Sequence, residues 1–99
     1  MRFILVLGGS GFGVGNYAPE VVRSIVEVEI PGIAEQIRAH GLANTPLSGL
    51  SREVVGVTAR DSSGALIISS PGSRGGALDT LEVVTPLLPA VFHQLDEQR

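Results

Sequence analysis

Apolar runs that stop at turn residues mark the predicted strands. Residues Phe3–Leu7 are continuously apolar, and the run ends at the glycine-rich stretch Gly8–Gly15. A short run of this kind predicts a strand buried on both faces of a sheet. A second run, Ala65–Ile68, follows the turn cluster Asp61–Gly64 and predicts another buried strand. Residues 54–57 predict a third, shorter strand.

Helical spacing of apolar residues follows the first glycine-rich loop and returns later in the chain. Pro19 stands at a favourable first helical position, and the helical pattern after it breaks at the Pro-Gly pair 31–32. A second helix is expected from there to Gly41, which is a typical C-cap. The last helical pattern covers residues 78–95 and contains two prolines, which are expected to kink or split it.

The order strand, glycine-rich loop, helix occurs twice and defines the predicted architecture. It implies parallel strands with helices packed on the sheet, in one α/β domain that spans residues 1–99. Ligands of such folds lie beyond the carboxyl ends of the strands, where both loops are expected. Because glycine admits close approach and helix N-termini favour negative charge, this edge is predicted to hold an anionic ligand.

Composition restricts the partners. The chain has 99 residues and a net charge of −3, and its seven basic residues are all arginine and dispersed along the sequence. Nucleic acid and anionic membranes reward clustered positive charge, so neither is the expected partner. No apolar run reaches ~18 residues, which predicts no membrane span, and the expected location is the cytoplasm. Charged residues make up 17%, below the ~25% typical of soluble domains, which favours an oligomer over a compact monomer.

Residues for catalytic or metal chemistry are sparse. The chain has no cysteine, and its two histidines, His40 and His93, are too few and too far apart for a zinc motif. His40 is expected to support a helix C-terminus, and His93 to be packed or solvated. Ser10 and Ser73 stand outside the G-x-S-x-G pattern, so they are expected to hydrogen-bond backbone or phosphate rather than act as nucleophiles.

The first loop matches the common nucleotide-binding patterns poorly. Residues 13–18 fit the loose form G-x-G-x-x-G/A, but these glycines lie well past the strand, and no acidic residue ends a second strand about 20 residues on. A P-loop is excluded because the chain has no lysine. Two arginines leave alternatives open. Arg74 contacts a phosphate or is a solvated surface residue, and Arg52 binds a ligand or pairs with a carboxylate such as Glu53 or Asp61.

Four blocks together resemble the molybdopterin-binding domain family, which contains MogA-type and MoaB-type molybdenum cofactor proteins and the matching domains of gephyrin and MoeA. The family pattern runs from an apolar strand through G-G-T-G to R-D-x-T-P-E; here residues 7–20 read LGGSGFGVGNYAPE. The segments P-G-[LIV]-A-E-x-[MIL]-R, T-P with L-S-R, and L-P-G-S-P are similar to residues 31–38, 45–52 and 70–74. The order and spacing of all four agree.

The resemblance implies a fold, a ligand and an assembly. The implied fold is α/β, three-layered, with a mixed, mostly parallel sheet and helices on both faces, truncated at the N-terminus. Family domains carry roughly fifty to sixty more residues before the first strand, so the chain is either a fragment or completed by another chain. The implied role is in molybdenum cofactor biosynthesis, with molybdopterin or a related phosphorylated pterin as ligand. The implied assembly is a homo-oligomer, a trimer by resemblance, or a complex with a partner chain that supplies the missing strands.

The resemblance also carries over site residues. The implied cofactor-binding residues are Gly8, Gly9, Ser10, Gly11, Pro19, Glu20, Pro71, Gly72, Ser73 and Arg74. The family aspartate implicated in adenylyl transfer corresponds to Asn16, and the arginine before it to Gly15. Asparagine keeps one acceptor oxygen but loses the charge that binds a divalent metal. Weakened or lost adenylyl transfer is therefore expected, and two hypotheses follow. The first is an active adenylyltransferase that uses ATP and Mg²⁺ despite Asn16. The second is a non-catalytic module that binds a pterin-like ligand, or an assembly or regulatory subunit that completes a sheet with a partner chain; Gly15, Asn16 and Ala18 favour this second hypothesis.

Overall fold

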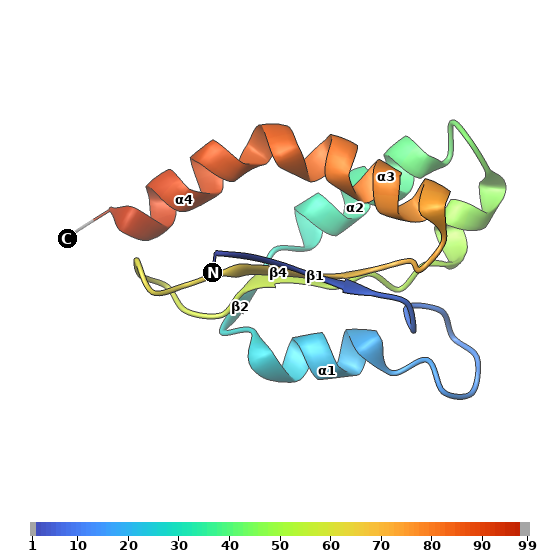
Figure 1. The fold of residues 1–99 in the computed structure, drawn as a ribbon, viewed down its shortest axis with the longest axis horizontal. Helices are drawn as coiled ribbons and strands as arrows, with labels where there is room; N and C mark the ends of the chain where they lie inside the picture. Colours follow the sequence, from blue (N-terminus) through green and yellow to red (C-terminus); the bar gives the residue numbers. More distant parts are fainter. Residues whose placement is uncertain (1, 98–99) are drawn as a thin grey trace.

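A mixed sheet with helices on both faces forms the domain (Figure 1). The computed structural model describes residues 2–97. Its strands are β1 (Phe3–Leu7), β2 (Val28–Glu29), β3 (Val55–Val57) and β4 (Leu66–Ser70), and its helices are α1 (Ala18–Ile25), α2 (Pro31–Gly41), α3 (Arg74–Val84) and α4 (Leu88–Asp96). Helix α1 covers one face of the sheet, and α2, α3 and α4 lie over the other. The predicted α/β class, the mixed sheet and the helices on both faces are confirmed.

The strands follow the spatial order β1-β4-β3-β2. β1 and β4 are parallel, with Leu5 opposite Ile68, whereas β3 pairs antiparallel with both β4 and β2. The sheet of the described residues is therefore less parallel than the sequence predicts. The reason is the short connection between β3 and β4, around Asp61–Gly64, because a connection of this length can join only antiparallel neighbours.

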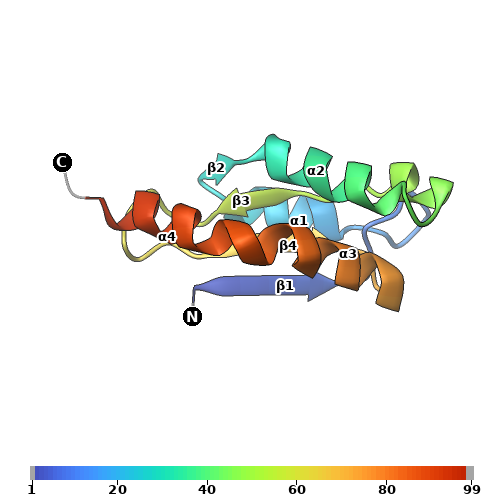
Figure 2. The ribbon, with the colours of Figure 1, turned by 90° about the horizontal axis from the view of Figure 1, so that it is seen from above.

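Strand β1 lies at the edge of the sheet (Figure 2). The sequence predicts a strand buried on both faces, and for β1 this is wrong in the described chain. Four of its residues are partly buried, and Leu7 at its end is 61% exposed. The cause is that β4 is the only strand paired with β1 among residues 2–97. By contrast, all five residues of β4 are buried, as predicted for the second apolar run.

The main core fills the space between the sheet and helices α2 to α4. It contains Ile33, Ala34, Ile37, Val55, Val57, Leu66, Ile68, Val84 and Leu95. A smaller cluster lies on the α1 side and contains Val22, Val54 and Ile67. Adjacent residues Ile67 and Ile68 point to opposite faces, because side chains alternate along a strand. β4 therefore holds both clusters together.

The C-terminal helical region is divided as its prolines predict. The short 3-10 helix η2 (Thr85–Leu87) separates α3 from α4. By length and composition alone, the helical segment Arg74–Asp96 is long and apolar enough to cross a membrane. The search of the sequence for an uninterrupted apolar run did not detect it, because polar residues interrupt the segment. In this structure its inner side supplies Val84 and Leu95 to the main core. Two further elements, β2 and the 3-10 helix η1 (Pro46–Leu50), are not predicted by the sequence pattern.

Candidate functional site

The two glycine-rich loops touch at the carboxyl ends of β1 and β4. The backbone N–H of Gly8 donates to the Ser70 carbonyl over 2.9 Å. Gly8 and Gly9 have φ values of +90° and +67°, a region that side chains other than glycine rarely adopt. A Cβ on Gly72 would lie 3.1 Å from the Gly8 Cα, so the second loop also needs glycine here. The parallel β1–β4 pair thus brings both loops to one edge, as the sequence predicts.

Arg52 fastens the first loop. Its Nε donates to the Gly11 carbonyl and its Nη2 to the Asn16 carbonyl, each over 2.7 Å. Its Nη1 and Nη2 also reach the Glu20 carboxylate, at 2.7 and 3.1 Å. The backbone N–H of Arg52 donates to the Ser10 carbonyl over 2.9 Å. One residue outside the loop therefore satisfies three loop carbonyls and one acidic side chain at the start of α1.

The carboxylate partner of Arg52 is Glu20 rather than the two candidates from the sequence. Glu20 lies in the first turn of α1, beside the loop that Arg52 crosses. The hydrogen bond from Arg52 holds the pKa of Glu20 below its ordinary value, and the same bond raises the pKa of Arg52. Asp61 instead accepts hydrogen bonds from Ser63 in its own turn, which lower the pKa of Asp61. Glu53 is buried elsewhere, in the cavity described below.

Asn16 is turned into the loop. The side-chain Oδ1 of Asn16 accepts from the backbone N–H of Gly11 over 3.3 Å, and the backbone N–H of Asn16 donates to the Gly13 carbonyl over 3.1 Å. A Cβ on Gly13 would lie 3.0 Å from the Asn16 Nδ2, so the side chain is closely wrapped by the loop. The Asn16 side chain thus hydrogen-bonds the loop itself.

A cavity of about 440 Å³ lies beside the two loops. This volume falls within the ~300–1,000 Å³ range of small-molecule sites. Four of the implied site residues line it, namely Ser10, Gly11, Pro71 and Ser73. Ser10 is the most enclosed of these residues, at 6% exposed. The loops therefore form one side of a pocket of ligand size.

The remaining implied residues are not in the lining of that cavity. Gly8 and Gly72 form the contact between the loops, and Gly9 lies against Ala18 at the start of α1. Pro19 is buried in the first turn of α1, and Glu20 holds Arg52. Arg74 is the exposed first residue of α3 and forms no ion pair among residues 2–97, and its phosphate contact stays a prediction. Gly8, Gly72, Pro19 and Glu20 therefore support the loops beside the cavity without lining it.

The rest of the cavity wall contains residues that sequence reasoning did not assign to the site. They are Ile37, Asn44, Thr45, Leu47, Ser48, Leu50, Ser51, Glu53, Gly75, Gly76 and Asp79. Much of this wall comes from η1, where Thr45 accepts from the Leu47 N–H over 3.2 Å. The sequence did mark part of this wall, because Thr45, Leu50 and Ser51 belong to the T-P and L-S-R segments that resemble the family. Glu53 and Asp79 lie outside the family-like blocks, so no such signal marked them.

Glu53 is a buried acid in this wall, 6% exposed. Its Oε2 accepts from the Thr80 hydroxyl over 3.0 Å, and its Oε1 accepts from the Ser51 hydroxyl over 3.4 Å. Burial raises the pKa of Glu53 to about 7, although these hydrogen bonds and the Arg38 charge lower it and the Asp79 charge raises it further. The carboxyl group can therefore either accept or donate a proton near neutral pH.

Helix α3 begins at the cavity. Ser73 is its N-cap, and the Ser73 hydroxyl accepts from the Gly76 N–H over 3.2 Å. Gly75 and Gly76 of the first turn line the cavity, so backbone rather than side chains faces the space. The first N–H groups of a helix have no intrahelical partners and carry partial positive charge. This corner of the cavity suits an anionic group such as phosphate.

The geometry agrees with a comparison of the sequence against known families. Residues 1–90 match the family described as "Probable molybdopterin binding domain". The chain belongs to this family. The resemblance carried by the four sequence blocks is thereby confirmed.

Relatives within the family confirm the fold. A Mog protein of molybdopterin biosynthesis from Mycobacterium ulcerans superposes with a TM-score of 0.87 at 35% identity, covering 96% of this chain and 60% of that chain. MoaB from Thermus thermophilus gives 0.79 at 41% identity, covering 94% and 56%. A molybdopterin adenylyltransferase from Escherichia coli is 35% identical over 83 residues, which is 84% of this chain and 40% of that protein. The chain thus spans less than two thirds of these relatives.

Replacing Arg52 by alanine is expected to loosen the first loop, because the carbonyls of Gly11 and Asn16 and the carboxylate of Glu20 lose a side-chain donor. Backbone amides of residues 11–16 should exchange with solvent at least about tenfold faster, while amides of β4 stay protected. Hydrogen exchange followed by mass spectrometry or NMR measures this. Arg74→Ala, in the other loop, is the matched control and should leave residues 11–16 unchanged. Equal exchange in Arg52→Ala and the parent chain would contradict the role of Arg52.

Glu53 predicts a pH dependence of stability. Its pKa in the folded chain, about 7, lies above its ordinary value of 4.5, so folding favours the protonated form. The stabilisation is full below the ordinary pKa and is lost as pH rises through about 7. The free energy of unfolding should fall by roughly 1–3 kcal/mol between about pH 5 and pH 8. Glu53→Gln should remove most of that fall in urea titrations, whereas exposed Glu35→Gln should keep it. The same fall in both variants would refute the assignment.

Proposed function

We propose that the cavity binds molybdopterin or a closely related phosphorylated pterin, as part of molybdenum cofactor biosynthesis. The observation that carries the proposal is the junction of the two family loops with the start of α3 beside a pocket of ligand size. Membership of the molybdopterin-binding family supports it. The full activities of relatives belong to longer chains, so the activity of this chain is part of the proposal.

The pocket offers different chemistry to the two ends of such a ligand. The phosphate is placed at the first turn of α3, beside Ser73 and Gly75, where backbone N–H groups favour an anion. The pterin ring carries amino and ring N–H donors, which suit the hydroxyl and carboxyl oxygens of Ser10, Glu53 and Asp79. The pocket has no arginine or lysine in its lining, so helix α3 supplies the favourable field for the anion.

We also propose that adenylyl transfer is weakened or lost in this chain. Mg²⁺ prefers carboxylate and other hard oxygen ligands. Residues 8–19 contain no carboxylate, and the Oδ1 of Asn16 is already engaged by Gly11. The loop therefore does not fit a Mg²⁺ ion at the family position. A non-catalytic module that holds the ligand, or that assembles with another chain, follows from the same loop.

A binding titration and an adenylylation assay separate ligand binding from catalysis. Molybdopterin titrated into the full chain in a calorimeter should bind, and Ser10→Ala should bind it about fivefold more weakly, because one buried hydroxyl is lost. Addition of ATP and Mg²⁺ should then yield adenylylated product at least about 10²-fold more slowly than with the Escherichia coli adenylyltransferase, since a charged group is missing. Asn16→Asp should raise the rate.

The controls keep binding and catalysis apart. Ser24→Ala changes an exposed serine on α1 and should bind molybdopterin like the parent chain. Fast turnover by the parent chain would overturn the weakened-activity proposal and leave the ligand intact. No heat of binding with the parent chain or with Asn16→Asp would overturn the ligand itself. The cytoplasmic location expected from the sequence stays a prediction.

The assembly proposal rests on β1. This strand is entirely apolar and has a hydrogen-bonded neighbour on one side among residues 2–97. An apolar edge strand presents unpaired backbone groups that invite another strand. We propose that a second copy or a partner chain pairs with it.

Light scattering on the purified full chain is expected to report an oligomer at micromolar concentration, or a complex once a partner is added. Ile4→Lys places a charge on this strand and should shift the population towards monomer or reduce solubility, because charged edges block strand addition. Lysine on the exposed surface of α1, in Ser24→Lys, is the matched control. A well-folded monomer that binds no further chain would contradict the proposal.

A further inference from the structure

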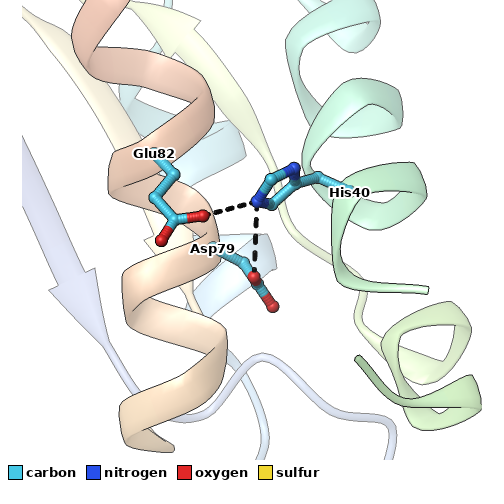
Figure 3. Close-up of side chains that lie close together, drawn as sticks. All are labelled: His40, Asp79 and Glu82. Carbon is cyan, nitrogen blue, oxygen red and sulfur yellow. Dashed lines mark hydrogen bonds and ion pairs between the residues drawn. The ribbon is translucent and has the colours of Figure 1, made fainter. Parts of the chain in front are cut away.

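Three side chains from two helices converge on one another (Figure 3). His40 is in the last turn of α2, and Asp79 and Glu82 lie one turn apart on α3. The His40 Nε2 is 2.6 Å from the Glu82 Oε2 and 3.7 Å from the Asp79 Oδ1. One ligand-type atom from each residue lies within 4.8 Å of the other two. The sequence predicted only that His40 supports a helix end.

We propose that His40, Asp79 and Glu82 bind one divalent cation of the zinc class. One imidazole nitrogen with two carboxylate oxygens is a donor set typical of Zn²⁺ and neighbouring first-row metals, whereas Mg²⁺ prefers oxygen alone. Around tetrahedral Zn²⁺, with bonds of about 2.0–2.2 Å, ligand atoms lie roughly 3.4 Å apart. The two measured distances from the imidazole bracket that value, so small side-chain rotations would complete the site.

Charge favours a cation here. With a neutral imidazole the cluster holds two negative charges on one helix face, and a divalent ion balances both. Within residues 2–97, the ion pairs of Asp79 and Glu82 are with His40 alone. The Asp79 side chain is only 10% exposed, so its charge is poorly screened by water.

The Asp79 ligand is held in place by neighbours. The Asn44 Nδ2 donates to the Asp79 Oδ1 over 3.1 Å, the oxygen that faces the imidazole. Hydrogen bonds of this kind orient metal ligands in known sites. Gly41, the residue after His40, leaves room for the carboxylate, since a Cβ there would lie 3.2 Å from the Asp79 Oδ2. A larger residue at position 41 would displace the ligand.

The exposure of the three side chains and the place of Asp79 in the cavity wall indicate what a bound ion would do. The side chains of His40 and Glu82 are 41% and 62% exposed, so an ion enters from solvent and keeps water in its remaining coordination positions. Asp79 also lines the ligand cavity. An ion held there would tie the end of α2 to α3 at the cavity wall. This inference does not depend on the identity of the cavity's ligand.

Calorimetric titration of Zn²⁺ into the full chain, free of any affinity tag and chelator, tests the site. One ion per chain should bind, and Co²⁺ in its place should give visible absorption bands of a low-symmetry site. Loss of an outer hydrogen bond alone costs ~10–100-fold in metal affinity, so His40→Ala should lose at least about tenfold. Asn44→Ala should lose less than His40→Ala. Mg²⁺ in excess should not displace Zn²⁺.

His93→Ala is the matched control, because His93 is the exposed histidine of α4. This variant should bind Zn²⁺ like the parent chain, and circular dichroism should show that each variant keeps its helices. A parent chain without saturable binding in the micromolar range would overturn the proposal and leave His40 as an ion-pair partner only. Equal affinity in His40→Ala and the parent chain, or loss in His93→Ala, would also overturn it.

Discussion

The fork of Arg52 is the interaction on which the arrangement of the first loop depends. A loop rich in glycine has little side-chain packing to hold it, and its conformational entropy in the unfolded chain is large. Arg52 compensates by donating to loop carbonyls from one rigid, planar group, and Glu20 keeps the guanidinium in place. Because Arg52 directly precedes the buried Glu53 and Val54, the loop is anchored to the sheet.

The cavity combines two opposing electrostatic influences. Glu53 and Asp79 give one wall negative character, while the start of α3 offers partial positive charge. A ligand with an anionic end and a ring rich in N–H donors satisfies both at once, whereas a simple anion would be repelled by the acids. The raised pKa of Glu53 softens that repulsion near neutral pH, because part of the population is then uncharged.

Most of the architecture was accessible from the sequence, and the exceptions have physical causes. The strands at 3–7 and 65–68, the helix after Pro31 and the division of the last helix follow from local apolar period and proline chemistry. The edge position of β1 was not accessible, because an apolar run reports what a strand is suited to contact rather than what lies beside it. Three features depend on contacts between residues far apart in the sequence, and the local spacing of residues does not predict such contacts. They are the pairing of Arg52 with Glu20, the cavity wall from η1 and the contact of His40 with α3.

The contact of Gly8 with Gly72 separates the shape of the site from its chemistry. Both loops meet backbone to backbone, and Arg52 holds carbonyls that every residue possesses. Substitutions of side chains that line the cavity, such as Ser10, can therefore change its chemistry without removing these backbone contacts. In evolutionary terms, a family member can exchange one reaction for another, or for simple retention of a ligand, while its fold stays under unchanged selection. The same separation makes the domain a scaffold into which new loop chemistry could be introduced by design.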